Sequence, residues 1–414
     1  MSRRAQNAVE SQLLILVTFA FVAFGLVMVY SATSASAAIG NGNPTGYVER
    51  QAIYAALGLA AMGFAARADY GSWRRLAPGL IVGALFLCLA VLVVGSRVNG
   101  ARRWIAVGPA AFQPSELAKV ALLIWTAAYL ARRPAPQRLS ELGRPLGVLV
   151  GLFCVVVLVE PDLGTAIAIV TMVGAMLLVA GTPLPTLGAA GTIVSAFGLL
   201  AIWLEPYRRA RVFSFLNPWG DAQGAGFQTV QGLISLGSGG IFGRGLGESI
   251  GKINYVPEAH TDMIAAVIGE ELGLVGLAAL AAGYCAFAYA GLRLALRCRD
   301  PFGKRLAAGV TALVCGQAII NLAAVLGVAP LTGIPLPFVS YGGSSLVVDL
   351  LATGILLNIA RGHAGSTRVE VPDRSRGDGR PRRAVAGGGR SAARTRGGGD
   401  VRRVAGSRRS AARS

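Results

Sequence analysis

The chain has 414 residues, of which 54% are hydrophobic and only 14% charged, and its formal net charge at pH 7 is +19. A soluble domain carries about 25% charged residues, so this composition excludes an ordinary soluble globular protein. The two histidines and five isolated cysteines show no spacing typical of a zinc site or a disulfide framework.

Apolar runs of membrane-spanning length recur along the chain. A helix needs about 20 apolar residues to cross ~30 Å of hydrocarbon. We therefore predict an all-α polytopic membrane protein with ten transmembrane helices. They cover about residues 12–31, 48–66, 76–95, 114–131, 145–160, 163–181, 185–204, 263–292, 305–328 and 343–360. The first run is longer than the apolar core of a signal peptide, so we interpret it as an uncleaved anchor.

Basic residues predict the orientation, because internal loops of membrane proteins are rich in lysine and arginine. With the N-terminus inside, three internal loops carry such clusters, and ten spans place the C-terminus inside as well. These clusters contain Arg67, Arg74, Arg75, Arg132, Arg133, Arg138, Arg144, Arg293, Arg297, Arg299, Lys304 and Arg305. Both termini are thus predicted to be cytoplasmic, with a large extracytoplasmic loop between spans 7 and 8 at about residues 205–261.

The chain divides into a transmembrane domain, residues 1–361, and a basic cytoplasmic tail, residues 362–414. The tail has 14 arginines against four acidic residues and almost no large apolar side chains, so we expect it to be disordered. It is expected to contact anionic lipid headgroups. We predict no nucleic-acid partner, because no aromatic residue is interleaved for base stacking.

The most informative stretch is 254–275, where a polar run with acids and a histidine passes directly into an apolar span. Asp262 is expected at the membrane surface, with Glu270 and Glu271 below it. Ionisable groups are costly there and indicate function. A helix-capping role for Asp262 stays open, because aspartate is a good N-cap residue. Glu270 and Glu271 point away from Asp262 at ~100° per residue and are assigned to separate contacts.

Other charged groups allow two interpretations. Glu116 and Lys119 are three residues apart and share a helix face, so they either neutralise each other or line a polar cavity facing Asp262. Arginines of the external loops either reach lipid headgroups or form a cationic rim for a phosphate-bearing headgroup. The acidic turn at Asp162 is expected to cap the sixth predicted helix, residues 163–181. The glycine-rich run 237–247 lacks the context of a nucleotide loop and is expected to form a tight turn.

Three blocks of sequence resemble the SEDS family, which comprises FtsW, RodA and SpoVE. The first runs from Asn99-Gly-Ala-Arg-Arg-Trp-Ile to Phe112-Gln-Pro-Ser-Glu-Leu-Ala-Lys119. The second runs from Gln228-Thr-Val-Gln-Gly-Leu-Ile-Ser to His260-Thr-Asp262, and the third is Gly333-Ile-Pro-Leu-Pro-Phe-Val-Ser-Tyr-Gly-Gly-Ser-Ser345. Residues 12–360 fit the resemblance, and the Gly-Gly-Ser-Ser block favours the FtsW branch.

The resemblance implies an inverting peptidoglycan glycosyltransferase that polymerises lipid II into glycan strands on the outer side of the cytoplasmic membrane. It implies a septal role in cell division, alongside divisome proteins and a class B penicillin-binding protein, an FtsI-like transpeptidase. An elongation role like that of RodA or a sporulation role like that of SpoVE stays open. So do a lipid II flippase and a non-enzymatic scaffold for the transpeptidase.

The resemblance also implies the site residues. Asp262 matches the proposed catalytic aspartate and would take the proton of the acceptor hydroxyl. Outer-loop arginines, or a divalent cation such as Mg²⁺ or Mn²⁺, would hold the pyrophosphate, and no cofactor or metal ligand is assigned. Substrate-binding residues are expected at polar positions of the matched blocks: Glu116, Lys119, Arg103, Trp104, Gln113, Ser115, Gln231, Ser235, Lys252, His260, Ser340 and Ser344.

Overall fold

The computed structural model describes residues 3–38, 44–98, 101–107, 110–253 and 255–361. These residues belong to one compact unit. The basic tail from residue 362 lies outside the described residues, so its boundary and its expected disorder stay predictions.

Within the described residues, helices account for most of the chain. The elements are α1 (Arg3–Ala38), α2 (Pro44–Arg67), α3 (Tyr70–Val94), β1 (Ser96–Val98), β2 (Ala101–Val107), β3 (Ala110–Phe112), α4 (Pro114–Arg132), α5 (Leu139–Leu142), the π-helical turn η1 (Gly143–Gly147), α6 (Val148–Val159), α7 (Leu163–Ala180), α8 (Leu184–Leu204), α9 (Pro206–Leu216), the 3₁₀ turn η2 (Pro218–Asp221), α10 (Phe227–Gly239), α11 (Ile264–Arg297), α12 (Pro301–Val325) and α13 (Gly343–Ala360).

Eight of the described helical segments are long and apolar enough to cross a membrane: α1, α3, α5 to α6, α7, α8, α11, α12 and α13. The other two predicted spans are also helical, as parts of α2 and α4. Their hydropathy is lower because α2 carries Glu49, Arg50 and Gln51 near its start and Arg67 at its end, and α4 begins with the polar pair Glu116 and Lys119. The all-α polytopic membrane fold is therefore confirmed, whereas ten spans and their orientation stay predictions.

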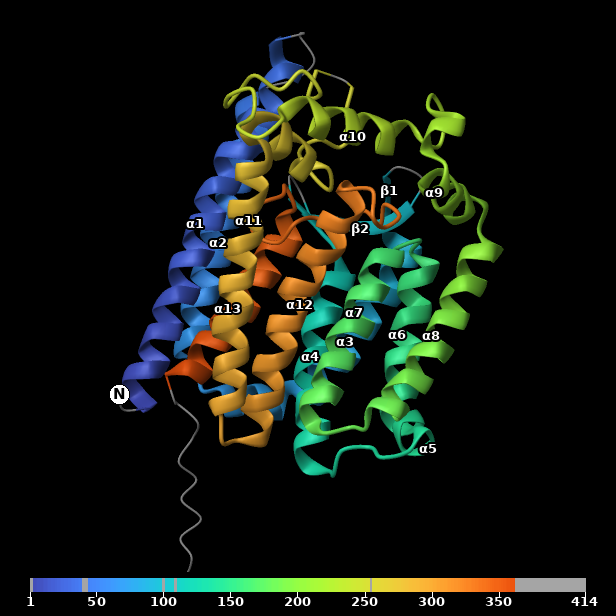
Figure 1. Ribbon diagram of the computed structural model, residues 1–414. Coiled ribbons are helices and arrows are strands. Elements are labelled where there is room, and N and C mark those ends of the chain that lie inside the picture. Colours follow the sequence, from blue (N-terminus) through green and yellow to red (C-terminus); the bar gives the residue numbers. More distant parts are fainter. Residues whose placement is uncertain (1–2, 39–43, 99–100, 108–109, 254, 362–414) are drawn as a thin grey trace, which may run out of the picture. The chain divides into compact units, whose positions relative to one another are not determined.

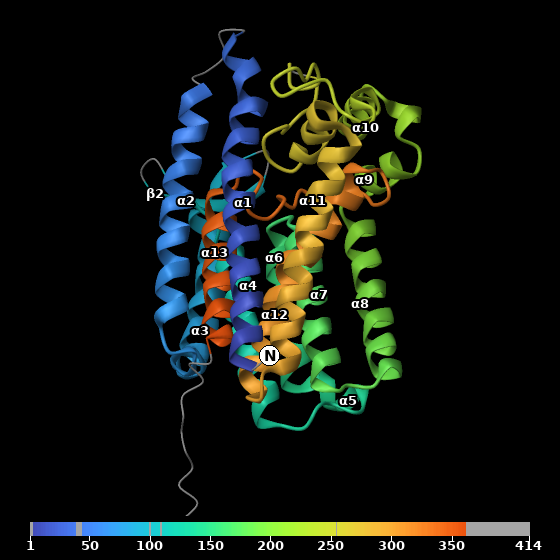
Figure 2. The ribbon, with the colours of Figure 1, turned by 60° about the vertical axis from the view of Figure 1, so that its left-hand side comes forward.

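The first and last described helices meet at one end of the bundle. The Asn7 side-chain amide donates a hydrogen bond to the Ala360 carbonyl at 3.4 Å, and α5 lies at this end too (Figure 1). The strands, α9 and α10 lie at the opposite end, as two views show (Figures 1 and 2). We call this opposite end the loop end, because it carries the long connection between α8 and α11.

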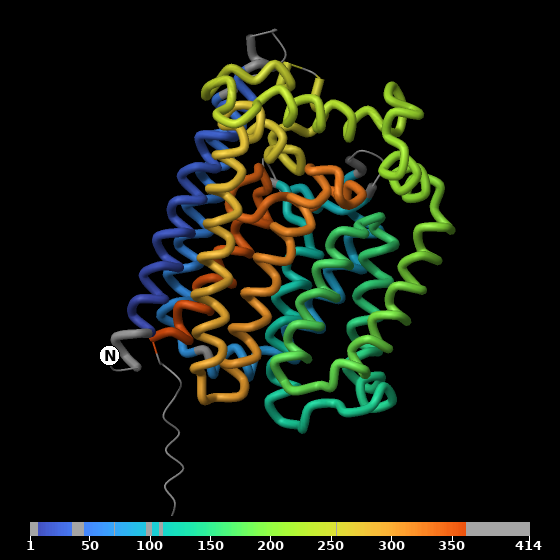
Figure 3. The backbone as a smooth tube through the Cα atoms, viewed as in Figure 1, coloured from blue at the N-terminus to red at the C-terminus, as the bar shows by residue number. Residues whose placement is uncertain are grey.

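The helices differ strongly in how far they are buried. In α13, 83% of the apolar stretch is buried, whereas none of the corresponding stretch of α8 is. α13 packs mainly along α2, and α12 packs against α7 and α11. α8 instead stands at the edge of the bundle (Figure 3). A peripheral helix beside a packed bundle leaves room for a cavity along its inner side.

The connection between α3 and α4 contains a small antiparallel sheet in the order β1-β2-β3. Ile105 of β2 pairs with Phe112 of β3. An Asn-Gly pair lies between β1 and β2 in the sequence, and this pair favours tight hairpin turns. The sheet leads directly into α4.

α11 is broken at Gly273, where φ is +67°. A segment of the long loop completes the hydrogen bonds of the broken turn. The Arg244 N–H donates to the Glu270 carbonyl at 3.0 Å, and the Leu274 N–H donates to the Gly240 carbonyl at 3.0 Å. A Cβ at Gly273 would overlap this loop backbone, so only glycine fits. The loop end is thereby joined to α11 through main-chain contacts.

The segment between α12 and α13, residues 329–342, folds back into the bundle. Leu336, Phe338 and Val339 are buried. The Tyr284 hydroxyl donates to the Pro337 carbonyl at 2.6 Å. Irregular backbone at this depth is tolerated where protein surrounds it, and the segment forms one wall of the site described next.

Candidate active site

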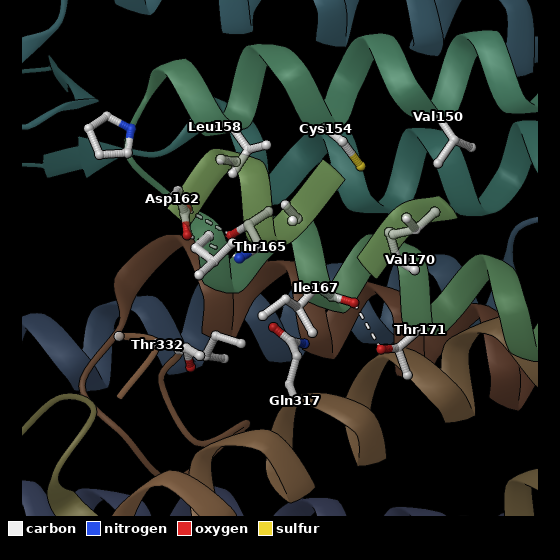
Figure 4. A pocket seen from close by; sticks show the side chains of 18 of the residues that line it. Val150, Cys154, Leu158, Asp162, Thr165, Ile167, Val170, Thr171, Gln317 and Thr332 are labelled. Carbon is white, nitrogen blue, oxygen red and sulfur yellow. Dashed lines mark hydrogen bonds between the residues drawn. The ribbon is translucent and has the colours of Figure 1, made fainter. Parts of the chain in front are cut away.

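A cavity of about 2010 Å³ runs along α6, α7 and α8. Its middle is lined mainly by apolar or small side chains, several of which are drawn in Figure 4. The charged residues among its described lining come from the loop end of the bundle. They are Arg103, Glu116, Asp162, Glu205, Arg208, Arg211, Glu258 and Asp262. The cavity is thus a long apolar groove with a polar head, suited to a lipid with a charged headgroup.

Asp262 lies in the polar head, two residues before α11. Only 8% of the surface of Asp262 is exposed. The N-cap of α11 is Met263, so Asp262 does not cap the helix and its side chain is available for other contacts. The Asn321 side-chain amide donates to the Asp262 carbonyl at 2.8 Å and to that of Ile334 at 2.8 Å. These two hydrogen bonds tie the aspartate backbone to α12 and to segment 329–342.

The environment of the Asp262 carboxyl favours a proton acceptor that works near neutral pH. Burial raises its pKa to about 6, while the Arg211 guanidinium opposes that rise and Glu258 adds to it. The Thr261 hydroxyl also donates to Asp262 Oδ1 at 3.3 Å. At pH 7 most of the population is therefore ionised and able to take a proton.

Glu116 and Lys119 form a buried ion pair at 2.8 Å on α4. Lys119 Nζ also donates to Gln317 Oε1 at 2.7 Å, and Gln317 Nε2 contacts Asp349 Oδ1 at 3.4 Å. Glu116 and Gln317 line the cavity that contains Asp262. The pair therefore neutralises itself, and its Glu116 member also forms part of the cavity wall.

Gln113 joins three elements at the start of α4. Its Nε2 donates to Ser115 Oγ at 2.9 Å and to Asp162 Oδ2 at 3.0 Å. Asp162 caps α7 through the Thr165 N–H at 3.0 Å, which confirms its predicted capping role. The Gln113 N–H donates to Ser344 Oγ at 3.1 Å. Gln113 lines the cavity, whereas Ser115 and Ser344 do not line it and instead form hydrogen bonds with Gln113.

Arg103 and Trp104 reach the cavity from β2. Arg103 Nε donates to the Glu160 carbonyl at 2.7 Å, and another of its nitrogens donates to the Pro161 carbonyl. The arginine thereby holds the turn between α6 and α7 against the sheet. Five of the predicted site residues thus line one cavity: Asp262, Glu116, Arg103, Trp104 and Gln113.

His260 and Ser340 flank the site without lining the cavity. The His260 ring lies 4.9 Å from the Tyr47 ring and 5.5 Å from the Tyr341 ring, and burial lowers its pKa. Ser340 Oγ accepts from the Leu336 N–H at 2.8 Å, which holds a turn of segment 329–342. Both residues therefore shape the wall beside Asp262.

Lys252 lies in a separate cluster on the long loop. Its ammonium pairs with Glu271 Oε1 at 3.0 Å and donates to the Gly247 carbonyl and to Ser31 Oγ of α1. Ser31 Oγ in turn donates to Glu271 Oε1 at 2.6 Å. The structure does not bring Lys252 to the cavity, because this buried network holds it against α1 and α11.

Glu270 holds the neighbouring part of the loop. It accepts from Ser249 Oγ at 2.6 Å and from the Ile250 N–H at 3.0 Å. Ser235 of α10 is buried near this contact, and Gln231 is half-buried on the same helix. The structure places neither Ser235 nor Gln231 in the lining of the cavity.

Removal of the Ser31 hydroxyl is expected to loosen the loop. Ser31→Ala deprives the buried Glu271 carboxylate of a donor, which is expected to lower the free energy of unfolding by about 1–3 kcal/mol. Thermal unfolding of the detergent-solubilised protein measures the effect. Ser34→Ala is the matched control, since Ser34 Oγ donates to a main-chain carbonyl of the same helix at 2.8 Å. Equal stability of the two variants would contradict the proposed contribution of Ser31.

The donor set of the cavity does not provide an obvious metal site. Among the described residues, no three His, Cys, Asp or Glu side chains are grouped so that they could hold a metal ion.

Several polar residues of the site were missed in the sequence. Gln317, Asn321 and Asp349 lie inside apolar spans and are buried. Polar residues inside membrane helices indicate function or specific pairing, so a systematic search of the spans for such residues would have found them. Arg208 and Arg211 were covered only by the general expectation for arginines of the external loops, because spacing alone does not show which arginines turn inward.

Comparisons with known proteins agree with this architecture. Residues 11–364 match the family of FtsW, RodA and SpoVE, described as cell cycle proteins. The probable peptidoglycan glycosyltransferase FtsW of Geobacter sulfurreducens is 40% identical over 350 residues, which cover 84% of this chain and 94% of that protein. Stage V sporulation protein E of Bacillus subtilis is 38% identical over 356 residues, covering 84% and 96%.

Solved structures show the same fold. A chain of a peptidoglycan synthase complex studied for coordinated polymerization and crosslinking superposes with a TM-score of 0.71 at 32% identity, covering 85% of this chain and 98% of that one. The rod shape determining protein RodA of Thermus thermophilus superposes with a TM-score of 0.63 at 30% identity, covering 84% and 96%. The chain therefore belongs to the SEDS family of FtsW, RodA and SpoVE proteins.

Proposed function

We propose that this protein is a peptidoglycan glycosyltransferase that polymerises lipid II on the outer side of the cytoplasmic membrane. One observation carries the proposal: a groove lined mainly by apolar side chains ends in a polar head that contains the buried Asp262 and the guanidinium of Arg211. A polyprenyl chain fits the apolar part, while the diphosphate and sugars need the polar head. The names of the related FtsW proteins support the same activity.

The chemistry is a transfer with inversion at the anomeric carbon. The donor sugar is α-linked to a diphosphate and the product is β-1,4-linked, so a single displacement with one base is sufficient. Asp262 takes the proton of the acceptor 4-hydroxyl as that oxygen attacks. The leaving diphosphate is already an anion, so it needs positive charge more than it needs an acid. Glu116 and Lys119 keep the wall of the polar head fixed.

The membrane arrangement follows from the same proposal. With ten spans, α2 and α4 cross the bilayer as members of the bundle, both termini are cytoplasmic, and the loop end faces outward. A polar headgroup sliding through the middle of the groove would lose its hydration against apolar walls. This argues for polymerisation at the outer surface over flipping of lipid II.

A role in septal wall synthesis is supported by the FtsW names among the relatives, although stage V sporulation protein E is nearly as similar. The related peptidoglycan synthase complex suggests a partner that crosslinks the product. We propose a class B penicillin-binding transpeptidase in that role. A fluorescent fusion concentrated at the division site would support septal function, and a fusion confined to the side wall would contradict it.

The direct test uses purified full-length protein, with and without its transpeptidase partner, and labelled lipid II. Glycan chains resolved by gel electrophoresis are expected from the wild type. Transport of intact lipid II across proteoliposomes without chain formation would instead favour a flippase. Neither product in the presence of a folded, partner-bound protein would favour a scaffold.

A further inference from the structure

The arginines of α9 point in two directions. Arg208 and Arg211 are three residues apart, share one face of the helix and line the cavity. Arg209 faces another way, with its guanidinium carbon 5.7 Å from the centre of the Trp203 ring. The helix therefore presents two cations to the cavity and keeps one outside it.

Arg208 is engaged by the bundle itself. It donates to the Ala201 carbonyl at 3.1 Å and also to the Leu158 carbonyl, which joins the ends of α8 and α6. Arg103 bonds main-chain carbonyls at the next turn in the same way. Both arginines therefore hold helix ends, each through two hydrogen bonds to main-chain carbonyls.

Arg211, by contrast, is held by one hydrogen bond and one contact with an aromatic ring. Its Nη1 donates to the Leu331 carbonyl at 3.1 Å, and its guanidinium carbon lies 4.9 Å from the centre of the Tyr207 ring. A guanidinium has five N–H donors, and this hydrogen bond uses one of them. The group is thus fixed in orientation beside the cavity with donors left for a ligand.

Gly333 keeps the space beside Arg211 open. A Cβ added there would lie 3.8 Å from Arg211 Nη1 and 4.0 Å from Asp262 Oδ2. The cation and the carboxylate therefore border one small space from two sides. Gly333 has φ +74°, a conformation that glycine adopts readily. Both its backbone and its missing side chain preserve this gap.

We propose that Arg211 and the space beside Gly333 form the subsite for the diphosphate of the lipid-linked donor sugar. The inference rests on the proposed polymerase function and adds the group that stabilises the leaving anion. Arginine suits this role because its planar fork bonds two phosphate oxygens at once.

The step balances with these groups alone. The acceptor 4-oxygen forms a bond to the anomeric carbon of the donor, and its proton passes to the Asp262 carboxylate. The bond between the anomeric carbon and the diphosphate oxygen breaks, and the polyprenyl diphosphate leaves with the electron pair. Arg211 donates to the oxygens on which this negative charge is spread.

The experiment compares Arg211→Gln, Arg211→Lys and Arg209→Gln in the full-length protein with its transpeptidase partner and labelled lipid II. Arg211→Gln is expected to lower kcat/KM about 10- to 100-fold, because it removes charge-assisted hydrogen bonds. Arg211→Lys keeps the charge but not the fork, so a smaller loss is expected. Arg209→Gln is the matched control on the same helix and is expected to retain wild-type turnover.

Inhibition by the leaving group separates binding from folding. Added polyprenyl diphosphate is expected to inhibit the wild type and Arg209→Gln equally, and to inhibit Arg211→Gln at least tenfold more weakly. Inorganic pyrophosphate tests the diphosphate without its lipid, and phosphatidylglycerol tests a single anionic phosphate in a lipid. If phosphatidylglycerol inhibits the wild type as strongly as polyprenyl diphosphate does, a diphosphate subsite would be overturned in favour of a general headgroup contact.

The pH profile gives a second readout that a purely structural role would not change. Arg211 favours the ionised form of Asp262, while Glu258 opposes it. Loss of the guanidinium is therefore expected to move the acidic limb of the rate profile to higher pH in Arg211→Gln. An unmoved limb together with wild-type turnover would overturn the inference while leaving the polymerase function intact.

Gly333→Ala tests the space itself. The added methyl group would occupy the gap, so at least a tenfold loss of turnover is expected. Gly181→Ala is the control for backbone strain, since Gly181 has φ +97° and open space around its Cβ position. Equal turnover of the two variants would overturn the subsite. Failure of the wild type to polymerise lipid II would instead remove the function on which the inference rests.

Discussion

Asp262→Asn is expected to abolish nearly all glycan polymerisation. A positioned general base contributes about 10²- to 10⁴-fold to a rate, and an amide cannot take the acceptor proton. Asparagine keeps the size of the side chain, and the Asn321 contact involves only the main chain of residue 262, so the fold is expected to survive. Labelled lipid II with purified variant and partner provides the measurement. Chains of equal yield from variant and wild type would reject Asp262 as the base.

The wild-type rate is expected to depend on pH through the same group. Burial raises the pKa of Asp262 to about 6, against the opposing effect of Arg211. The base works only when deprotonated, so activity should be nearly complete at pH 8 and fall about tenfold per pH unit well below pH 6. A flat profile between pH 5 and pH 8 would show that another group accepts the proton.

Lys119→Met is expected to cause the largest loss of stability. The ammonium stands between Glu116 at 2.8 Å and Gln317 at 2.7 Å, and Asp349 lies beyond the glutamine. Its removal leaves buried carboxylates without a cation, which typically costs about 3–5 kcal/mol. Thermal unfolding in detergent and the yield of monodisperse protein measure the loss.

The double variant Glu116→Gln/Lys119→Met is the control for this interpretation. It removes both charges of the pair, so it is expected to recover a good part of the stability lost in Lys119→Met. Recovery of stability without recovery of polymerisation would show that the pair also serves the reaction. Additive losses in the double variant would show that the two side chains act independently.

Hydrophobic patterning predicted the positions of the long helices, because membrane-length apolar runs have few alternatives to helices. It also singled out Asp262 as a candidate site residue, since a carboxylate at the start of an apolar span is unusual. It did not predict the break of the span 263–292 at Gly273. Glycine inside an apolar run is common in membrane helices, so the residue type alone did not indicate a break.

The sequence did not predict which side chains from distant segments contact one another. Lys252 was expected to contribute to the substrate site because it lies at a polar position of a block that resembles the family, yet it is paired with Glu271 and Ser31. Ser31 lies in the first span, more than two hundred residues away. The inward turn of Arg211 likewise depends on how α9 lies against segment 329–342. Such contacts arise from packing between distant segments, and no local pattern encodes them.

The break in α11 has a consequence for biosynthesis. The part after Gly273 is roughly 36 Å long at 1.5 Å per residue, so it can enter the bilayer by itself as an ordinary helix. The part before Gly273 cannot, because its last carbonyls are satisfied by the Arg244 region of the preceding loop, and unpaired peptide groups in hydrocarbon cost several kcal/mol each. Insertion of this helix by the translocation machinery and folding of the loop before it are therefore coupled events in making the protein.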